Sequence, residues 1–292
     1  MHKDEIEINK ELVKNLIAEQ FPQFNNLSLW EVNSTGTVNT IYRLGDKYYV
    51  RLPRLDWANE SLLNEWRILP VISNHLTLAV PEIVKKGEPS IDYPLHWAIY
   101  KWIDGDTIDN SSINEVETAK SLAEFIMELR SIHILEDAPK AGRKPLYELD
   151  EMTVNAIREC DSDIDNEKAL KVWRKLLNTK SWDGNPVWIH ADLLKPNLIV
   201  REGRLFAIID FGSAGIGDPA FDIIPAWTIF TSKSRYLFRS LLNVDDYTWL
   251  RAKAYALHQA ALIIPYYRKS NPAFVNQAKN TITNILLSTE VL

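Results

Sequence analysis

The 292-residue sequence has a single cysteine, few glycines and no long apolar run. The one cysteine, Cys160, excludes an intramolecular disulfide and a cysteine-based metal cluster. No segment approaches the roughly 18 uncharged apolar residues that a membrane-spanning helix needs. Residues 1–15 contain no apolar stretch, so they do not resemble a signal peptide. We therefore expect a soluble, cytoplasmic protein with no membrane partner.

An excess of positive charge is also missing. The formal net charge is −6, which argues against nucleic acid as a partner because a phosphate backbone requires a basic face. This charge permits a cationic substrate without requiring one. Aromatic residues, by contrast, are abundant: 10 Trp and 11 Tyr indicate well-packed cores or a pocket lined by rings.

The first hundred residues have the pattern of a small sheet with helices. Residues 5–20 have the spacing of an amphipathic helix, and a second helix over 57–69 must end or kink at Pro70. Gly45-Asp46 is typical of a hairpin turn. Runs of β-branched and aromatic residues predict five strands, at 27–33, 40–44, 48–52, about 81–87 and 97–102.

The rest of the chain is mostly helical in pattern. Helices are expected over 114–135, within 148–179 and over most of 217–289, and a hairpin is expected over 198–209. This order predicts an α+β protein of two lobes. Residues 1–103 would form a five-stranded antiparallel sheet with a helix, and residues 104–292 a mainly helical lobe.

The segment from Trp188 to Asp222 carries the chemistry. It reads WIHADLLKPNLIVREGRLFAIIDFGSAGIGDPAFD, so Asn197 follows Asp192 by five residues and Asp210 follows Asn197 by thirteen. Phosphoryl transfer needs a positioned nucleophile and metal ions that bridge the phosphates. An Asp can orient a hydroxyl and accept its proton, and an Asn and a second Asp offer the hard oxygens that Mg²⁺ prefers. The hairpin between Asn197 and Asp210 would bring these two residues together.

A simpler interpretation makes Asp192 and Asn197 helix caps or turn residues and Asp210 a solvated turn acid. Each residue fits that interpretation by itself. The complete set does not, because Ile209-Asp210-Phe211-Gly212 emerges from an apolar strand.

This segment resembles the catalytic and metal-binding loops of the aminoglycoside phosphotransferase family, small-molecule kinases with a protein-kinase-like fold. The resemblance implies that Asp192 is the catalytic base and that Asn197 and Asp210 hold Mg²⁺. It implies that His190 orients the catalytic loop, although a histidine could also be a general base, and that Asp222 is a structural acid supporting the loop. The Gly-Asp-Pro-x-x-Asp tail looks most like the antibiotic-kinase branch.

The resemblance extends to the nucleotide-binding lobe. A loop covering the phosphates would comprise Ser34, Thr35, Gly36, Thr37 and Asn39, although the same residues suit an ordinary β-turn.

The third strand places Arg51 where this family usually has Lys, a departure because a planar guanidinium does not reproduce a point ammonium. Its expected ion-pair partner is Glu65, with Glu60 as the alternative. The segment Tyr100-Lys101-Trp102-Ile103 would be the hinge that binds the purine.

The resemblance implies transfer of the γ-phosphate of ATP or GTP to a hydroxyl of an antibiotic such as an aminoglycoside or macrolide, by a monomer or dimer. An acidic run over 148–165 could favour a cationic acceptor, or could be a solvated helix face. The aromatic residues Trp227, Phe230 and Tyr266-Tyr267 suit a more apolar one. The alternatives are a kinase of a choline- or sugar-like metabolite, a nucleotide-binding module without turnover, suggested by Arg51, and a Mg²⁺-dependent hydrolase.

Overall fold

The computed structural model describes residues 5–32, 38–108 and 113–288. The N-terminal part is a five-stranded antiparallel sheet with strand order β1-β2-β3-β5-β4. Two helices accompany it, α1 (Lys10–Gln20) and α2 (Asp56–Ile72). The strands are β1 (Leu29–Glu31), β2 (Asn39–Leu44), β3 (Tyr48–Pro53), β4 (Ile83–Gly87) and β5 (Trp97–Lys101).

The C-terminal part is mainly helical. It has two small sheets, a three-stranded one ordered β6-β8-β9 and a pair of β7 and β10. The helices are α3 (Glu115–Ser131), α4 (Asp150–Glu159), α5 (Asn166–Leu177), α6 (Pro225–Thr228), α7 (Ser232–Leu241), α8 (Asp246–Tyr267) and α9 (Pro272–Leu287). The strands are β6 (Asp106–Thr107), β7 (Val187–Ile189), β8 (Leu198–Arg201), β9 (Arg204–Ile208) and β10 (Gly215–Gly217).

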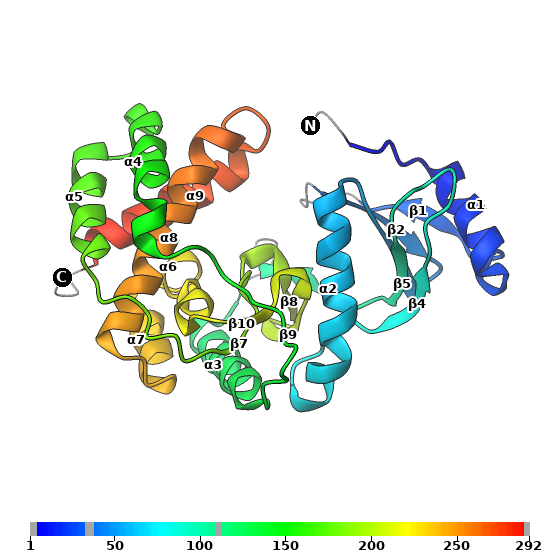
Figure 1. Ribbon diagram of the computed structural model, residues 1–292, viewed down its shortest axis with the longest axis horizontal. Helices are drawn as coiled ribbons and strands as arrows, with labels where there is room; N and C mark the ends of the chain where they lie inside the picture. The colour runs from blue at the N-terminus through cyan, green and yellow to red at the C-terminus, as the bar shows by residue number, and fades with distance from the viewer. Residues whose placement is uncertain (1–4, 33–37, 109–112, 289–292) are drawn as a thin grey trace.

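The two parts lie side by side, and α2 occupies the space between the five-stranded sheet and the β8–β9 hairpin (Figure 1). The α+β prediction is confirmed, with an antiparallel five-stranded sheet first and helices after it. None of the described helices combines the length and apolarity needed to cross a bilayer.

Alternation along the strands explains how the sheet serves two cores. Val50 and Trp97 belong to a hydrophobic cluster with α1, whereas Ala98 and Tyr100 belong to a larger cluster with α2 and the C-terminal helices. Successive strand side chains point to opposite faces, so the two faces of β5 contact different cores. The larger of the two clusters thereby joins α2 to the C-terminal part.

Several predicted boundaries were wrong. Helix α1 begins only at Lys10, because the Asn9 side chain caps it by accepting a hydrogen bond from the Leu12 N–H at 2.9 Å. Helix α2 continues two residues beyond Pro70, to Ile72. Helix α3 ends four residues early, at Ser131, whereas the helix expected within 148–179 is present as α4 and α5, separated by a short 3₁₀ turn. The short strands β6, β7 and β10 were not expected.

Candidate active site

The β8–β9 hairpin brings Asn197 and Asp210 to the same end of one small sheet. Leu198 pairs with Ile208, and the Ile209 N–H donates to the Asn197 carbonyl at 3.0 Å. The turn is closed by Glu202 and Gly203, both with positive φ. Hairpin pairing returns the chain to its start, so the predicted proximity of these residues follows from local structure.

Asp192 lies on the loop between β7 and this hairpin and is held by Asn197. The Asn197 Nδ2 donates to the Asp192 Oδ2 at 3.0 Å and to its backbone carbonyl at 2.9 Å. Burial raises the pKa of Asp192 to about 7, with a further increase from Asp210, while Asn197 and Arg143 act against it. A carboxylate with this pKa is suited to exchange a proton near neutral pH.

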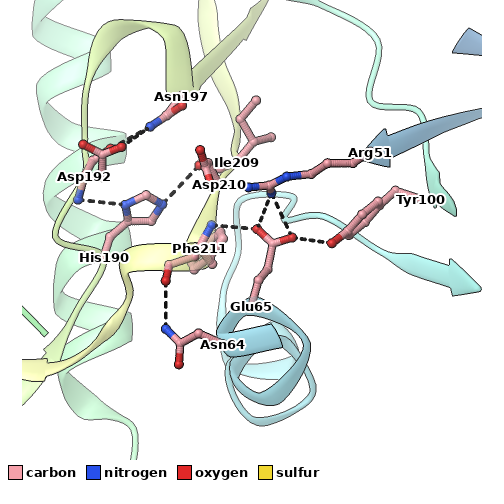
Figure 2. A network of polar contacts seen from close by, with 11 residues as sticks. Arg51, Asn64, Glu65, Tyr100, His190, Asp192, Asn197, Ile209, Asp210 and Phe211 are labelled. Atoms are coloured by element: carbon pink, nitrogen blue, oxygen red, sulfur yellow. Dashed lines mark hydrogen bonds and ion pairs between the residues drawn. The ribbon is translucent and has the colours of Figure 1, made fainter. Parts of the chain in front are cut away.

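His190 supports the loop from beneath. Its Nδ1 accepts a hydrogen bond from the Asp192 N–H at 3.2 Å, and its Nε2 lies 3.2 Å from the Ile209 carbonyl, so the neutral Nε2–H tautomer satisfies both contacts (Figure 2). Burial lowers the pKa of His190 to about 4. The ring packs edge-to-face on Phe211 at 4.6 Å and is fully buried. With both nitrogens engaged, it is placed to orient Asp192 rather than to reach a substrate.

Asp222 fixes the start of the same loop. Its two carboxylate oxygens accept the backbone N–H groups of His190 and Ala191, each at 2.9 Å. Ala191 has a φ of 65°, a conformation that costs a non-glycine residue about 1 kcal/mol or more. Asp222 is fully buried, and burial raises its pKa to about 6. The paired hydrogen bonds hold the loop in this uncommon backbone conformation.

Arg51 connects the two lobes through Glu65 and Asp210 (Figure 2). Its Nη1 lies 3.2 Å from both Glu65 carboxylate oxygens, and its Nη2 donates to the Asp210 Oδ1 at 2.9 Å. Glu65 also accepts the Tyr100 hydroxyl at 2.5 Å and the Phe211 N–H at 2.9 Å. Of the two candidate partners, Glu65 is therefore the one that contacts Arg51.

Charge explains the protonation states in this network. Burial disfavours the charged guanidinium, but Asp210 and Glu65 outweigh that effect and hold the pKa of Arg51 well above its usual range. Burial likewise opposes ionisation of Asp210, yet Arg51 lowers the pKa of that carboxyl below its ordinary value. For Glu65, burial prevails over Arg51 and raises the pKa.

The turn after Asp210 allows α2 to pack closely. A Cβ on Gly212 would lie 1.9 Å from the Ser61 Oγ and 3.0 Å from the Ser61 carbonyl oxygen, so only glycine fits. The Asn64 Nδ2 donates to the carbonyls of Gly212 and Ala214, each at 2.9 Å. Asp210 itself has a left-handed conformation, with φ 65° and ψ 67°. Sequence reasoning missed Ser61 and Asn64, since nothing in their local pattern distinguishes them from other helix residues.

A cavity of about 420 Å³ opens in front of these groups. Asp192, Asn197, Asp210 and Arg51 all line it, together with Asn39. Other lining residues are Val38, Trp57, Ala58, Ser61, Leu194, Pro196, Ser213, Tyr267, Asn271, Ala273, Phe274 and Gln277. The cavity thus receives side chains from both lobes. Its aromatic lining residues are Trp57, Tyr267 and Phe274, and of these only Tyr267 was predicted from the sequence as a candidate for the acceptor site.

The donor set at this cavity fits magnesium. Both hydrogen bonds of the Asn197 amide use its nitrogen, so its oxygen is available as a ligand. Asp210 contributes a carboxylate that lies beside the cavity. Within the described part of the chain, no cluster of three or more His, Cys, Asp or Glu residues could hold a metal. Two oxygen ligands completed by water and phosphate match the preference of Mg²⁺.

The predicted nucleotide-binding residues are placed unevenly. Ser34, Thr35, Gly36 and Thr37 lie outside the described residues. Asn39 lines the cavity, and its buried Oδ1 has no hydrogen-bond partner among the described residues. An acceptor without a partner is available to a ligand.

The predicted hinge does not line the cavity. The Lys101 N–H donates to the Glu82 carbonyl at 2.9 Å, and the Trp102 N–H donates to the Lys47 carbonyl at 2.8 Å. Two of the donors expected to face a purine are thus already used, while the Tyr100 hydroxyl points to Glu65. Ile103 follows the strand without regular structure.

Two of the aromatic residues considered for an acceptor are core residues. Trp227 and Phe230 are buried in the hydrophobic cluster of the C-terminal part and do not line the cavity. Tyr266 is exposed and does not line the cavity, whereas its neighbour Tyr267 does.

Comparison with known proteins places this site in a family context. The model of the family described as the phosphotransferase enzyme family matches residues 30–255. A curated relative, the uncharacterized protein YcbJ of Bacillus subtilis strain 168, is 25% identical over 209 residues. That alignment covers 65% of this chain and 65% of YcbJ, just under two thirds of its length.

Solved structures share the fold. The GDP and kanamycin complex of APH(2")-IIIa superposes with a TM-score of 0.71 at 16% identity and covers 94% of this chain and 98% of that one. The macrolide 2'-phosphotransferase MphH from Brachybacterium faecium gives a TM-score of 0.61 at 17% identity, covering 93% and 98%. The predicted kinase-like fold is therefore confirmed.

Proposed function

The chain belongs to the phosphotransferase enzyme family, and from that membership we propose that it is a small-molecule kinase. It transfers the γ-phosphate of ATP or GTP to a hydroxyl of an antibiotic-like compound of the aminoglycoside or macrolide type. The observation that carries the proposal is the convergence of Asp192, Asn197, Asp210 and Arg51 on one cavity. Structures of similar fold are named as complexes with GDP or ATP, which supports a nucleoside triphosphate as donor.

Asp192 is the catalytic base of this proposal. It accepts the proton of the acceptor hydroxyl while that oxygen forms a bond to the γ-phosphorus. The bond between the γ-phosphorus and the β,γ-bridging oxygen breaks, and its electron pair leaves with the nucleoside diphosphate. His190 and Asn197 keep the carboxylate in place through the contacts described above.

Asn197 and Asp210 would hold Mg²⁺, which supplies positive charge to the phosphate oxygens when bound. Arg51 takes the position usual for Lys in this family, with Glu65 holding its guanidinium. In the proposed division of the chain, residues 1–103 bind the nucleotide and residues 104–292 carry the catalytic loop, the metal ligands and the acceptor site.

The test is Asp192→Asn, measured by mass-detected phosphate transfer and by separate titration of Mg²⁺-nucleotide binding. We expect transfer to fall at least about a hundredfold, as for loss of a positioned base, with nucleotide affinity nearly unchanged. Asp183→Asn, a change of an exposed acid outside the cavity, is the matched control. Near wild-type transfer by Asp192→Asn would contradict the base assignment. Unchanged Mg²⁺-dependent binding in Asp210→Ala would remove Asp210 from the metal site.

A further inference from the structure

Part of the cavity wall is made of aromatic and amide side chains from distant parts of the chain. Trp57 comes from the first turn of α2. Tyr267 ends α8, Asn271 caps α9, and Phe274 and Gln277 lie in the first two turns of α9. The rings of Tyr267 and Phe274 meet edge-to-face at 5.2 Å. Trp57 is 57% exposed, so a ligand in the cavity would cover apolar surface that now faces water. Burial of such surface favours an acceptor with an apolar face.

The charged residues lining this cavity, among the described ones, are Arg51, Asp192 and Asp210. Each has a task in the transfer reaction. Arg51 is paired with Asp210 and Glu65, and the proposed roles of Asp192 and Asp210 leave neither carboxylate free for a second partner. A polycation entering here would lose its hydration without gaining a dedicated carboxylate, which is unfavourable.

The acidic run over 148–165 does not compensate, because none of its residues lines the cavity. Asp150 accepts the Trp173 indole N–H at 2.7 Å. Asp163 is paired with Arg268 at 2.9 Å and with Lys279 at 2.6 Å. These acids therefore support helix packing and surface ion pairs.

Neutral groups on the wall are suited to hydroxyls and carbonyls. The Asn271 Oδ1 already accepts the Phe274 N–H at 3.1 Å as the N-cap of α9, which leaves the Asn271 amide N–H groups as donors. The Gln277 amide offers both a donor and an acceptor. Such groups bind uncharged polar atoms without a large desolvation penalty.

From this wall, and resting on the proposed kinase function, we propose that the acceptor carries at most one positive charge and presents an apolar face. Phe274 and Gln277 are its specificity-determining residues. Phe274 contacts the apolar face. Gln277 disfavours an acceptor with several amines, because its side chain is a neutral amide at a position where a carboxylate would attract them.

The experiment compares erythromycin, a macrolide with one amine, with kanamycin, which carries several. Phosphate transfer to each is followed by mass with ATP and with GTP, alongside further uncharged and singly charged hydroxyl compounds. We expect kcat/KM to be at least about tenfold higher for the best singly charged or neutral compound than for kanamycin. Equal or faster transfer to kanamycin, or no transfer to any neutral or singly charged member, overturns the proposal.

Two variants test the assigned residues. Phe274→Ala should raise KM for the accepted compound on the order of tenfold, as expected for loss of a buried ring contact, with KM for the nucleotide unchanged. Gln277→Glu should raise kcat/KM for kanamycin relative to the accepted compound. Tyr236→Ala, which removes an exposed aromatic residue of α7 outside the cavity, is the matched control. An unchanged acceptor KM in Phe274→Ala overturns the assignment.

Failure of the underlying kinase function gives a different result. A protein that binds no Mg²⁺-nucleotide, measured without any acceptor, contradicts the proposed function itself. A protein that binds nucleotide and phosphorylates kanamycin best, in a reaction that Asp192→Asn abolishes, retains the kinase function and refutes only the acceptor class.

Discussion

The ion pair between Arg51 and Glu65 should be strongly coupled, and a double-mutant cycle with Arg51→Met and Glu65→Leu measures the coupling. The Glu65 side chain has 0% exposure and that of Arg51 7%. Glu65 accepts hydrogen bonds from Arg51, from the Tyr100 hydroxyl and from the Phe211 N–H. Removal of Arg51 leaves the buried Glu65 without a cationic partner, and removal of Glu65 leaves the buried Arg51 with Asp210 as its one remaining acid.

The magnitude follows from that burial. Breaking a buried pair by removing one member costs about 3–5 kcal/mol, whereas replacing both members with apolar side chains is often nearly neutral. In the double variant the Tyr100 hydroxyl and Phe211 N–H still lack an acceptor, at about 1–3 kcal/mol each. We therefore expect a coupling free energy of at least about 2 kcal/mol.

The same reasoning predicts an asymmetry between the two acids that contact Arg51. The Asp210 side chain is 37% exposed, so water can solvate it when Arg51 is removed. The cycle of Arg51→Met with Asp210→Asn should give a smaller coupling than the cycle with Glu65.

The assay is urea unfolding followed by tryptophan fluorescence, with the free energy of unfolding taken from the midpoint and slope. The control is a cycle of Arg67→Met with Asp137→Ala, an exposed pair at 2.9 Å whose side chains are 50% and 76% exposed. Its coupling should lie below about 1 kcal/mol. Additivity within about 0.5 kcal/mol for Arg51 and Glu65 would refute the reasoning.

Two further predictions concern His258 and Gly212. Burial, reinforced by the charge of Arg143, lowers the pKa of His258 to about 4. The unfolded chain therefore binds the proton first, and stability falls by up to about 3 kcal/mol as the pH drops from about 6.5 to 4. His258→Asn should flatten this part of the stability profile, and an unaltered slope contradicts the prediction. Gly212→Ala should destabilise the protein by about 1–3 kcal/mol, because its Cβ would overlap Ser61. Ser61→Gly should restore part of this loss in thermal unfolding, and equal losses with and without it would exclude the contact.

The predicted elements were most accurate where a local pattern decides them. The hairpin β8–β9 and the five strands of the N-terminal sheet follow from alternation and turn residues. The extension of α2 beyond Pro70 was missed, because packing against both lobes outweighs the preference of proline to end a helix. The strands β7 and β10 were missed because each has three residues and depends on the other for its hydrogen bonds.

The same division applies to the candidate site. The sequence alone determined that Asp192, Asn197 and Asp210 lie near one another, since a loop and a hairpin join them and short-range backbone hydrogen bonds control that geometry. Only the tertiary structure decided that Arg51 meets Asp210, 159 residues away, and that Glu65 meets Phe211, 146 residues away. These contacts depend on how α2 and the N-terminal sheet pack against the C-terminal part. The acceptor wall depends on the same docking, because Trp57 and Phe274 share one cavity only once the two lobes are packed together.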